Sequence, residues 1–250
     1  MLTEQRYQVI LELLEKQKSI TVTEVKELLE ASESTVRRDI TALHKAGKLT
    51  KVFGGAIALK QQSKVSAAEP TVAQKIEVNK GEKHKIAAYG AGMITDDDFV
   101  YVDAGTTTGY MLDYISSDTK AAFVTNAVAH AQRLAAMGVK VCLVGGELKG
   151  STEAVIGSMA MKMIDAFHFT KGFFGTNGVT EEEGYTTPDA NEAMVKQAAM
   201  KHCRECYVLA DSAKFGEVSS VTFAAFEDAQ VLTERCPKEY ENVENITVVL

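Results

Sequence analysis

The sequence predicts an α/β protein with an N-terminal winged helix-turn-helix and a larger, doubly wound domain. Residues 1–58 contain three short amphipathic segments, followed by two β-prone runs around a Gly-Gly pair. From residue 99 onward, apolar runs typical of buried strands alternate with helical patterns, which implies a parallel sheet. Residues 59–72 have no apolar periodicity and include Pro70, so we expect a linker there and the second domain over 73–250.

Apolar spacing and a cap predict the first two helices. Four apolar residues recur at i, i+3, i+4 and i+7, as on one face of a helix: Tyr7, Ile10, Leu11 and Leu14. A second helix begins at a capping box, in which the Thr21 hydroxyl and the Glu24 carboxylate each accept the other residue's backbone amide. The apolar residues that we expect this helix to bury are Val22, Val25, Leu28 and Leu29.

A third helix follows after a connection too short for anything but a tight turn. Ser32 is its expected cap, and Gly47 follows its end, as is usual for a glycine that terminates a helix. The apolar face that we expect this helix to bury consists of Val36, Ile40 and Leu43. The residues left pointing outward are Ser34, Thr35, Arg37, Arg38, Thr41 and Lys45.

Residues 49–53 and 56–59 are β-prone and flank Gly54-Gly55, which predicts a hairpin. Three helices and a hairpin make a winged helix-turn-helix, whose third helix enters the major groove of DNA. The net charge of the whole chain is -7. Residues 1–60 nevertheless carry 10 Lys and Arg against 8 Asp and Glu, a net +2, which leaves -9 for the remaining 190 residues.

The positive charge is most concentrated over residues 37–51, where five basic residues face Asp39 alone. Because attraction to phosphate follows local positive charge, we predict that the third helix and the wing bind double-stranded DNA. A small helical protein-interaction domain is the alternative. The residues expected to face DNA are Ser32, Ser34, Thr35, Arg37, Arg38, Thr41, Lys45 and Lys51. Phosphates would repel Asp39, so we expect it to fix the adjacent arginines or to pair with the first helix.

Five apolar runs predict strands in the second domain: 99–102, 123–126, 139–144, 173–175 and 207–210. Polar residues follow these strands, at the sheet edge where open α/β folds bind ligands. Gly105 precedes three hydroxyl residues and a helix N-terminus, which suits a phosphate, although such a segment can also be an ordinary turn. Carboxylates and amides suited to sugar hydroxyls are Asp103, Asn126, Asn177, Glu192 and Asp211. Lys196 and Lys214 suit a second anionic group.

Five motifs in order resemble the DeoR family of bacterial repressors and cover essentially the whole chain. They are Ser32-x-x-Thr-Val-Arg-Arg-Asp39 with a Gly-Gly wing, Asp103-Ala-Gly-Thr-Thr-Thr108 with Thr125-Asn126, Gly145-Gly146, Gly175-Thr-Asn-Gly178, and Asp211-Ser-Ala-Lys214. The stretch from Gly175 to Lys196 is most similar to fructose-operon repressors. The resemblance implies a repressor of a sugar operon that a phosphorylated sugar, such as fructose 1-phosphate, releases from its operator.

The resemblance implies an effector site at the predicted sheet edge. Its expected residues are Asp103, Gly105, Thr106, Thr107, Thr108, Thr125, Asn126, Gly145, Gly175, Thr176, Asn177, Gly178, Glu192, Lys196, Asp211 and Lys214. The family's sensor domain is similar to ribose-5-phosphate isomerase, so an active sugar-phosphate isomerase fused to a DNA-binding domain is the rival hypothesis. Glu192 and Lys214 match that enzyme's base and lysine by motif. Its acid-rich loop, however, matches residues 175–178, which contain no carboxylate, so we expect binding without catalysis.

Two departures from the family pattern concern charge. The wing usually carries Arg and His, whereas this chain has Lys51, which keeps a charge but not the bidentate fork. Glu181-Glu182-Glu183 lies beside the expected ligand loop, where we expect a solvated hairpin tip.

Composition bounds the remaining possibilities. No apolar run approaches the ~20 residues that a bilayer span needs, and the first residues lack a signal-peptide profile, so we expect a cytoplasmic protein without membrane contact. Four cysteines make no disulfide scaffold, and we expect Cys203-x-x-Cys206 to mark a helix end rather than a metal or redox site. We expect neither a metal nor a cofactor. Useful operator affinity requires more than one winged helix, so a homo-oligomer, either a dimer or a tetramer, is expected.

Overall fold

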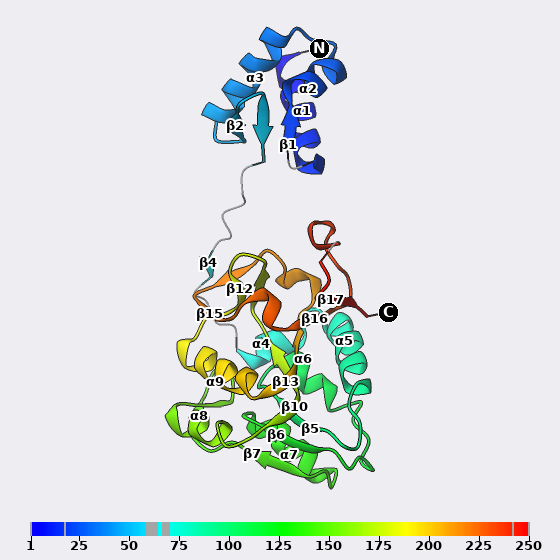
Figure 1. Cartoon of the computed structure of the whole chain (residues 1–250), viewed down its shortest axis with the longest axis vertical. Coiled ribbons are helices and arrows are strands. Elements are labelled where there is room, and N and C mark those ends of the chain that lie inside the picture. The colour runs from blue at the N-terminus through cyan, green and yellow to red at the C-terminus, as the bar shows by residue number, and fades with distance from the viewer. Residues whose placement is uncertain (1, 18, 59–64, 67–70, 242, 250) are drawn as a thin grey trace. The chain divides into compact units, whose positions relative to one another are not determined.

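The computed structural model describes residues 2–17, 19–58, 65–66, 71–241 and 243–249. The chain divides into two compact units, Met1–Gln62 and Ser63–Leu250 (Figure 1). Most of the expected linker 59–72 lies outside the described residues. Of its described members, Val65–Ser66 form strand β4 and Val72 begins helix α4, and both elements belong to the second unit.

The first unit is the predicted winged helix-turn-helix. Its helices are α1 (Thr3–Gln17), α2 (Val22–Leu29) and α3 (Glu33–Lys45). Its antiparallel sheet has the order β1-β3-β2, formed by β1 (Ser19–Thr21), β2 (Thr50–Val52) and β3 (Gly55–Ile57). The sequence did not reveal β1, which is too short to show an alternating pattern. The core residues come from all three helices and the sheet: Ile10, Leu14, Ile20, Val25, Val36, Ile40, Leu43 and Ala56.

The predicted caps are confirmed. The Glu24 amide donates to the Thr21 hydroxyl at 3.2 Å, and the Thr21 amide donates to the Glu24 carboxylate at 2.7 Å. The Ser32 hydroxyl accepts from the Thr35 amide at 3.2 Å. Gly47 follows α3 with a φ of 65°, in the left-handed region that suits glycine. These local features fix where α2 and α3 begin and where α3 ends.

Two details of the first unit were predicted wrongly. Leu28 is 54% exposed, because it lies about 100° around α2 from the buried Leu29 and so falls outside the apolar stripe. The wing turn is Phe53-Gly54, whereas Gly55 already pairs with Val52 in the sheet. A Cβ on Gly55 would lie 2.0 Å from the Ile20 carbonyl oxygen, so the close approach of β1 requires glycine.

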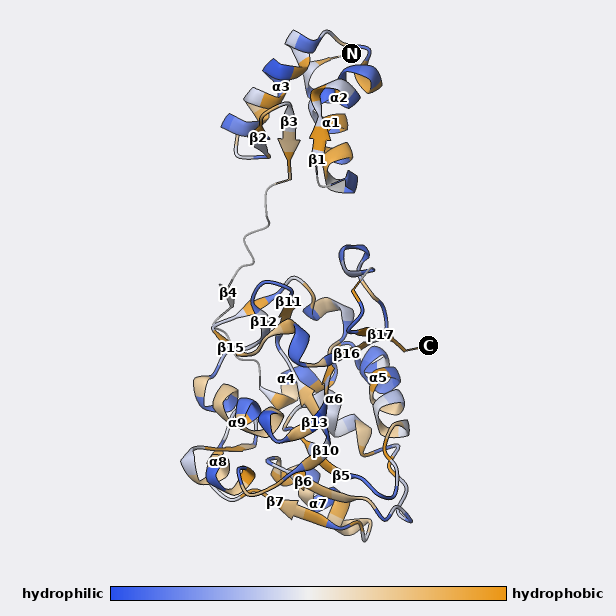
Figure 2. Cartoon of the chain, viewed as in Figure 1, coloured by the Kyte–Doolittle hydropathy of each residue, from blue (hydrophilic) through white to orange (hydrophobic). Residues whose placement is uncertain are grey.

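The second unit contains the predicted doubly wound sheet. Seven parallel strands have the order β17-β16-β13-β10-β5-β6-β7. In sequence order they are β5 (Phe99–Val102), β6 (Ala122–Thr125), β7 (Val141–Leu143), β10 (Phe169–Gly175), β13 (Cys203–Leu209), β16 (Gln230–Thr233) and β17 (Ile246–Val248). Figure 2 shows apolar residues along much of this sheet. The last two strands were not predicted.

Helices cover both faces of the sheet, which is why its strands are apolar throughout. One face carries α5 (Lys80–Gly92), α6 (Thr106–Met111) and α7 (Val128–Ala136), and the other carries α8 (Ser158–Ile164) and α9 (Ala190–Lys201). Successive strand residues alternate between these two cores. Val100 and Val102 pack with Ile86 of α5, whereas Tyr101 packs in the core that contains Ala193 of α9.

Smaller elements surround the carboxyl ends of the strands. A hairpin pairs β8 (Glu147–Lys149) with β9 (Ala154–Ile156), and a three-stranded sheet joins β11 (Gly178–Thr180), β12 (Gly184–Thr187) and β15 (Val221–Ala224). Glu181–Glu183 form the tip of the β11–β12 hairpin, as predicted. Helix α4 (Val72–Ile76), the 3-10 turn η1 (Ser212–Lys214) and the parallel pair of β4 (Val65–Ser66) with β14 (Val218–Ser219) complete this region. Of the helices that the structure describes, none is long and apolar enough to cross a membrane.

The tyrosines Tyr101 and Tyr185 give a matched stability test. Both are fully buried, but the Tyr101 hydroxyl has no hydrogen-bond partner among the described residues, whereas the Tyr185 hydroxyl donates to the carbonyl oxygens of Phe226 and Ala229, each at 2.9 Å. Tyr101→Phe should therefore keep or raise the melting temperature of the full chain. Tyr185→Phe should lower the free energy of unfolding by about 1–2 kcal/mol. Equal losses in the two variants would contradict this assignment.

Candidate functional site

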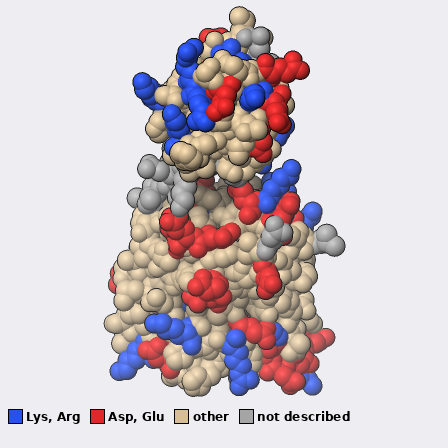
Figure 3. Space-filling view, turned by 45° about the horizontal axis from the view of Figure 1, so that its top comes forward, with Lys and Arg blue, Asp and Glu red and all other residues tan. Residues whose placement is uncertain are grey.

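The exposed face of α3 carries the predicted DNA-facing residues. Ser32, Ser34, Arg37, Arg38 and Lys45 are exposed, and Thr35 and Thr41 are half-buried. In Figure 3, basic side chains gather on the side of the first unit that α3 and β2 occupy, and acidic ones gather largely on the other side. The wing joins this face, because the Lys51 ammonium donates to the Thr41 hydroxyl at 2.9 Å. The fold therefore brings all eight predicted residues to one helix and its adjacent strand.

The ion pairs around α3 show which charged side chains stabilise the fold and which are available to contact DNA. Asp39 is buried and accepts from the Arg6 guanidinium at 2.7 and 3.0 Å, which ties α3 to α1 as the second of the two expected roles. Arg37 pairs with Glu33 at 2.7 Å on the exposed surface. Arg38 has no ion-pair partner among the described residues, so its guanidinium is the one on α3 that is ready for a phosphate or a base.

A pocket at the carboxyl ends of β5, β10 and β13 gathers many of the predicted effector residues. Those that line it are Gly105, Thr106, Thr107, Gly175, Thr176, Asn177, Glu192, Lys196, Asp211 and Lys214. Gly105 follows β5 and leads into α6, which Thr106 and Thr107 open. Gly175 ends β10, Thr176 and Asn177 follow it, and Asp211 and Lys214 follow β13. Glu192 and Lys196 instead lie one turn apart on α9 and do not follow a strand.

The other predicted effector residues support the pocket from behind or lie apart from it. The Asn126 amide oxygen accepts from the Ala104 amide at 2.8 Å, and the Thr108 hydroxyl donates to the Asp103 carbonyl at 2.7 Å. Both bonds hold the loop that carries Gly105. Thr125 is buried at the end of β6, and Gly178 of β11 pairs with Thr186 of β12. Gly145 is exposed after β7 and does not line the pocket.

Lys196, which lines the pocket, binds Asp103, which lies behind the lining. Lys196 Nζ contacts Asp103 Oδ2 in a short ion pair and also donates to the Gly175 carbonyl at 3.0 Å. The Gly175 amide donates to Asp103 Oδ2 at 3.1 Å. Burial raises the pKa of the Asp103 carboxyl, and the Lys196 ammonium and these hydrogen bonds oppose that rise. Asp103 is therefore a structural partner of Lys196 and does not line the pocket.

A buried imidazole supports the loop that carries Gly105. His130 of α7 packs against Gly109, where an added Cβ would lie 2.9 Å from its Nε2 atom. Burial and the nearby Arg133 lower the pKa of His130 to about 4, so the imidazole is neutral near pH 7. A neutral ring adds no charge beneath the loop.

Three polar residues of the lining were not predicted from the sequence: Lys75, Lys83 and Thr152. Lys83 is only 4% exposed, and its ammonium donates to the Lys75 carbonyl at 2.5 Å. Burial lowers the pKa of Lys83, and Lys214 and Lys75 lower it further, against the opposing effect of Asp211. One signal was available, because Lys83 shares a helix face with the buried residues Ile86, Ala87 and Gly90. Because lysines are rarely buried unless they are paired, a lysine on an apolar helix face indicates a specific partner or ligand.

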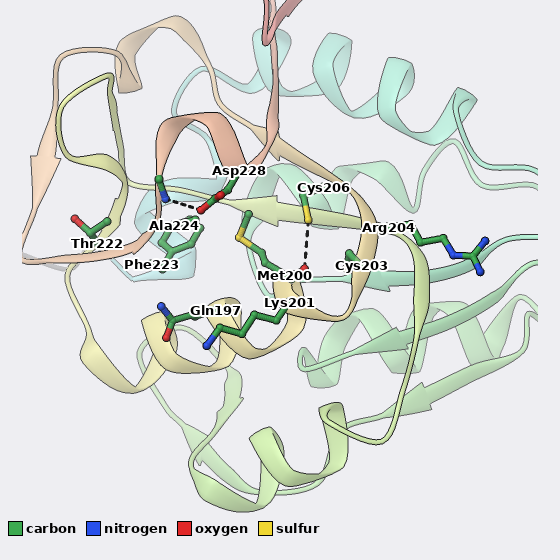
Figure 4. A pocket seen from close by; sticks show the side chains of 11 residues that line it. Gln197, Met200, Lys201, Cys203, Arg204, Cys206, Thr222, Phe223, Ala224 and Asp228 are labelled. Atoms are coloured by element: carbon green, nitrogen blue, oxygen red, sulfur yellow. Dashed lines mark hydrogen bonds between the residues drawn. The ribbon is translucent and has the colours of Figure 1, made fainter.

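A larger cavity, of about 410 Å³, lies between α9, β13 and β15 (Figure 4). It contains none of the predicted effector residues, and its floor includes Met200, Phe223, Cys203 and Cys206. Both cysteines are free thiols in β13. The two thiols lie beside each other, and the interaction with the Cys206 thiol, together with burial, raises the pKa of Cys203. Among the described residues, no group of three or more metal-ligating side chains could hold a metal ion.

Comparison with family models decides the family. Residues 6–62 match the DeoR-like helix-turn-helix domain, and residues 78–235 match the DeoR C terminal sensor domain. The chain belongs to the DeoR family. A helix-turn-helix regulator of this family binds DNA, and α3 lies within the matched helix-turn-helix domain.

Individual relatives agree with the family assignment. The uncharacterized HTH-type transcriptional regulator FruR of Bacillus subtilis strain 168 is 40% identical over 250 residues, which cover 100% of this chain and 98% of the relative. The lactose phosphotransferase system repressor of Streptococcus mutans serotype c is 33% identical over 93% of this chain and 92% of its own length. These relatives are transcriptional regulators and not enzymes. The solved ribose 5-phosphate isomerase A of Methanocaldococcus jannaschii is 12% identical, with a TM-score of 0.42 over 55% of each chain.

The ion pair between Asp103 and Lys196 predicts a strong loss of stability when one partner is removed. Asp103→Asn leaves the Lys196 ammonium buried without its counter-charge, so the free energy of unfolding should fall by about 3–5 kcal/mol. Lys196→Met should have a similar effect, and the double variant should lose much less than the sum of the two. Urea denaturation of the four proteins measures this coupling. Additive losses would contradict a direct pair.

Proposed function

We propose that this chain represses a fructose-utilisation operon and leaves its operator when fructose 1-phosphate enters the pocket. The observation that carries the proposal is the convergence of Lys75, Lys83 and Lys214 with hydroxyl, amide and carboxylate side chains in one pocket. Cations select an anionic group, and the other side chains suit a polyol. The motifs between Gly175 and Lys196, which resemble fructose-operon repressors, and the relative FruR support the choice of sugar.

The lining suggests how a sugar phosphate would lie. Thr106 and Thr107 open α6, where backbone amides lack intrahelical partners and attract a phosphate. Lys83 and Lys214 would add positive charge to that end of the pocket. Glu192 would accept hydrogen bonds from sugar hydroxyls, and Asn177 would both accept and donate them.

Glu192 also explains why the proposal is binding and not isomerisation. An enediol mechanism needs a base free to take a proton, with acids on the oxygens. The Glu192 carboxylate accepts a short hydrogen bond from the Thr152 hydroxyl and lies 3.3 Å from the Lys149 ammonium. The loop over residues 175–178 has no carboxylate to serve as the acid. The residues present therefore favour recognition of the sugar.

Release from DNA would need two copies of the chain or more. One winged helix contacts few base pairs, so we propose that sensor units associate and place two recognition helices on repeated half-sites. The effector would then act through its preference for the arrangement that does not fit the operator. The segment around α4 leads from the pocket back toward the first unit along the chain.

An effector titration tests the proposal directly. Full-length protein bound to an operator duplex selected from random DNA should dissociate on addition of fructose 1-phosphate, and higher concentrations of fructose 6-phosphate and glucose 6-phosphate should be needed. Gel shift or fluorescence anisotropy measures the release. No response to any sugar phosphate would reject the effector assignment and leave DNA binding intact.

Arg38→Ala should weaken operator binding without changing effector binding. Losing one phosphate contact should reduce the slope of log K against log salt by about 1, and losing a base contact should relax specificity at that base. Anisotropy at several salt concentrations measures both effects, and calorimetry with fructose 1-phosphate checks the pocket. Arg204→Ala, at an exposed arginine of the second unit, is the matched control. Equal operator affinity in Arg38→Ala and wild type would remove Arg38 from the interface.

A further inference from the structure

The proposed effector pocket is closed in this structure. Its free volume is about 70 Å³, whereas small-molecule sites typically offer roughly 300 Å³ or more. A sugar phosphate can therefore enter only if some lining group moves. The group best placed to move belongs to the turn that joins the largely exposed strand β8 to β9, and the other walls consist largely of sheet-edge loops and the helices α5 and α9.

That group is Thr152, in the turn between β8 and β9. Its hydroxyl donates a short hydrogen bond to Glu192 Oε1 inside the pocket. The Lys149 ammonium of the same hairpin lies 3.3 Å from Glu192 and 3.0 Å from Asp189, the residue that caps α9. Thr152 thus offers Glu192 the same donor that a sugar hydroxyl would offer.

The same turn holds the start of α4. The Val72 amide donates to the Ser151 carbonyl at 3.3 Å, and Val72 and Lys75 of α4 line the pocket. Glu153, the last residue of the turn, has a φ of 56°, in the left-handed region that a glutamate side chain disfavours. The turn is therefore held in place by its contacts and not by an intrinsic backbone preference.

We propose that Thr152 is an internal stand-in for an effector hydroxyl, and that a hydroxyl of the bound sugar replaces it at Glu192. The inference rests on the proposed function of the pocket. Displacement of Thr152 moves the turn, which removes Ser151 from Val72 and frees the first turn of α4. Because α4 follows the segment that leads from the DNA-binding unit, the closed turn defines the operator-binding state and the displaced turn defines the released state.

The exchange also sets a chemical requirement on the ligand. The Glu192 carboxylate accepts hydrogen bonds, so the incoming group must be a hydrogen-bond donor. The Lys149 ammonium balances only the charge of Glu192 and Asp189, so the incoming group must not bring a further negative charge to that end. A phosphate at the end with Lys83 and Lys214 and a hydroxyl at Glu192 satisfy both ends of the pocket. A sugar bisphosphate places an anion against Glu192 and should bind less well.

Thr152→Val tests the exchange, because it keeps the shape of the side chain and removes its hydroxyl. Without the internal competitor, the closed state is less populated before any ligand is added. Fructose 1-phosphate should then bind about tenfold more tightly by calorimetry, and the ligand-free protein should bind operator about tenfold more weakly. Hydrogen exchange at Val72–Ile76 in the ligand-free variant should match that of wild type saturated with fructose 1-phosphate.

Two controls separate the possible outcomes. Thr152→Ser keeps the hydroxyl and should behave as wild type, and Thr222→Val removes a hydrogen-bonding threonine hydroxyl outside the pocket and should change neither affinity. Weaker or unchanged fructose 1-phosphate binding in Thr152→Val, with a wild type that does respond, overturns the stand-in role alone. A wild type that does not respond to fructose 1-phosphate overturns the proposed function and this inference with it.

Discussion

The buried ion pair between Asp103 and Lys196 is the contact on which the second unit's site depends. It joins the end of β5 to α9, and both partners also bond Gly175 at the end of β10. Burying two charges is unfavourable unless each is fully satisfied, so the pair persists only if all three elements keep their positions. Glu192 lies one helical turn before Lys196, and the pair thereby fixes where the Glu192 carboxylate meets the pocket.

The same geometry places a weakly held group beside a strongly held one. α9 is anchored by the buried pair, whereas the β8–β9 turn that meets Glu192 follows β8, a strand that is largely exposed. We therefore expect an entering ligand to displace the hairpin turn before it displaces the helix. The turn also contacts α4, so the compliant side of the pocket is the side that continues toward the DNA-binding unit along the chain.

The sequence predicted features set by local chemistry or by strand periodicity. The caps at Thr21 and Ser32 follow from neighbouring residues, and the parallel sheet follows from apolar runs between helical patterns. The choice of partners was not predictable. Asp103 and Lys196 are 93 residues apart, and each alone resembled a ligand-binding residue. Thr152 could not be identified either, because its role depends on how the β8–β9 hairpin folds over α9. The burial of Lys83 could have been predicted from the sequence, because the other residues on its helix face are apolar.

The central claim is that operator and effector compete through one conformational equilibrium of the chain. Thermodynamic linkage gives this claim a numerical test, because two coupled ligands must weaken each other's binding by the same factor. The affinity of fructose 1-phosphate for the full chain should be measured by calorimetry, with and without saturating operator duplex. The account predicts weaker effector binding on DNA, by the same factor by which the effector weakens operator binding. Equal effector affinity in both conditions would contradict it.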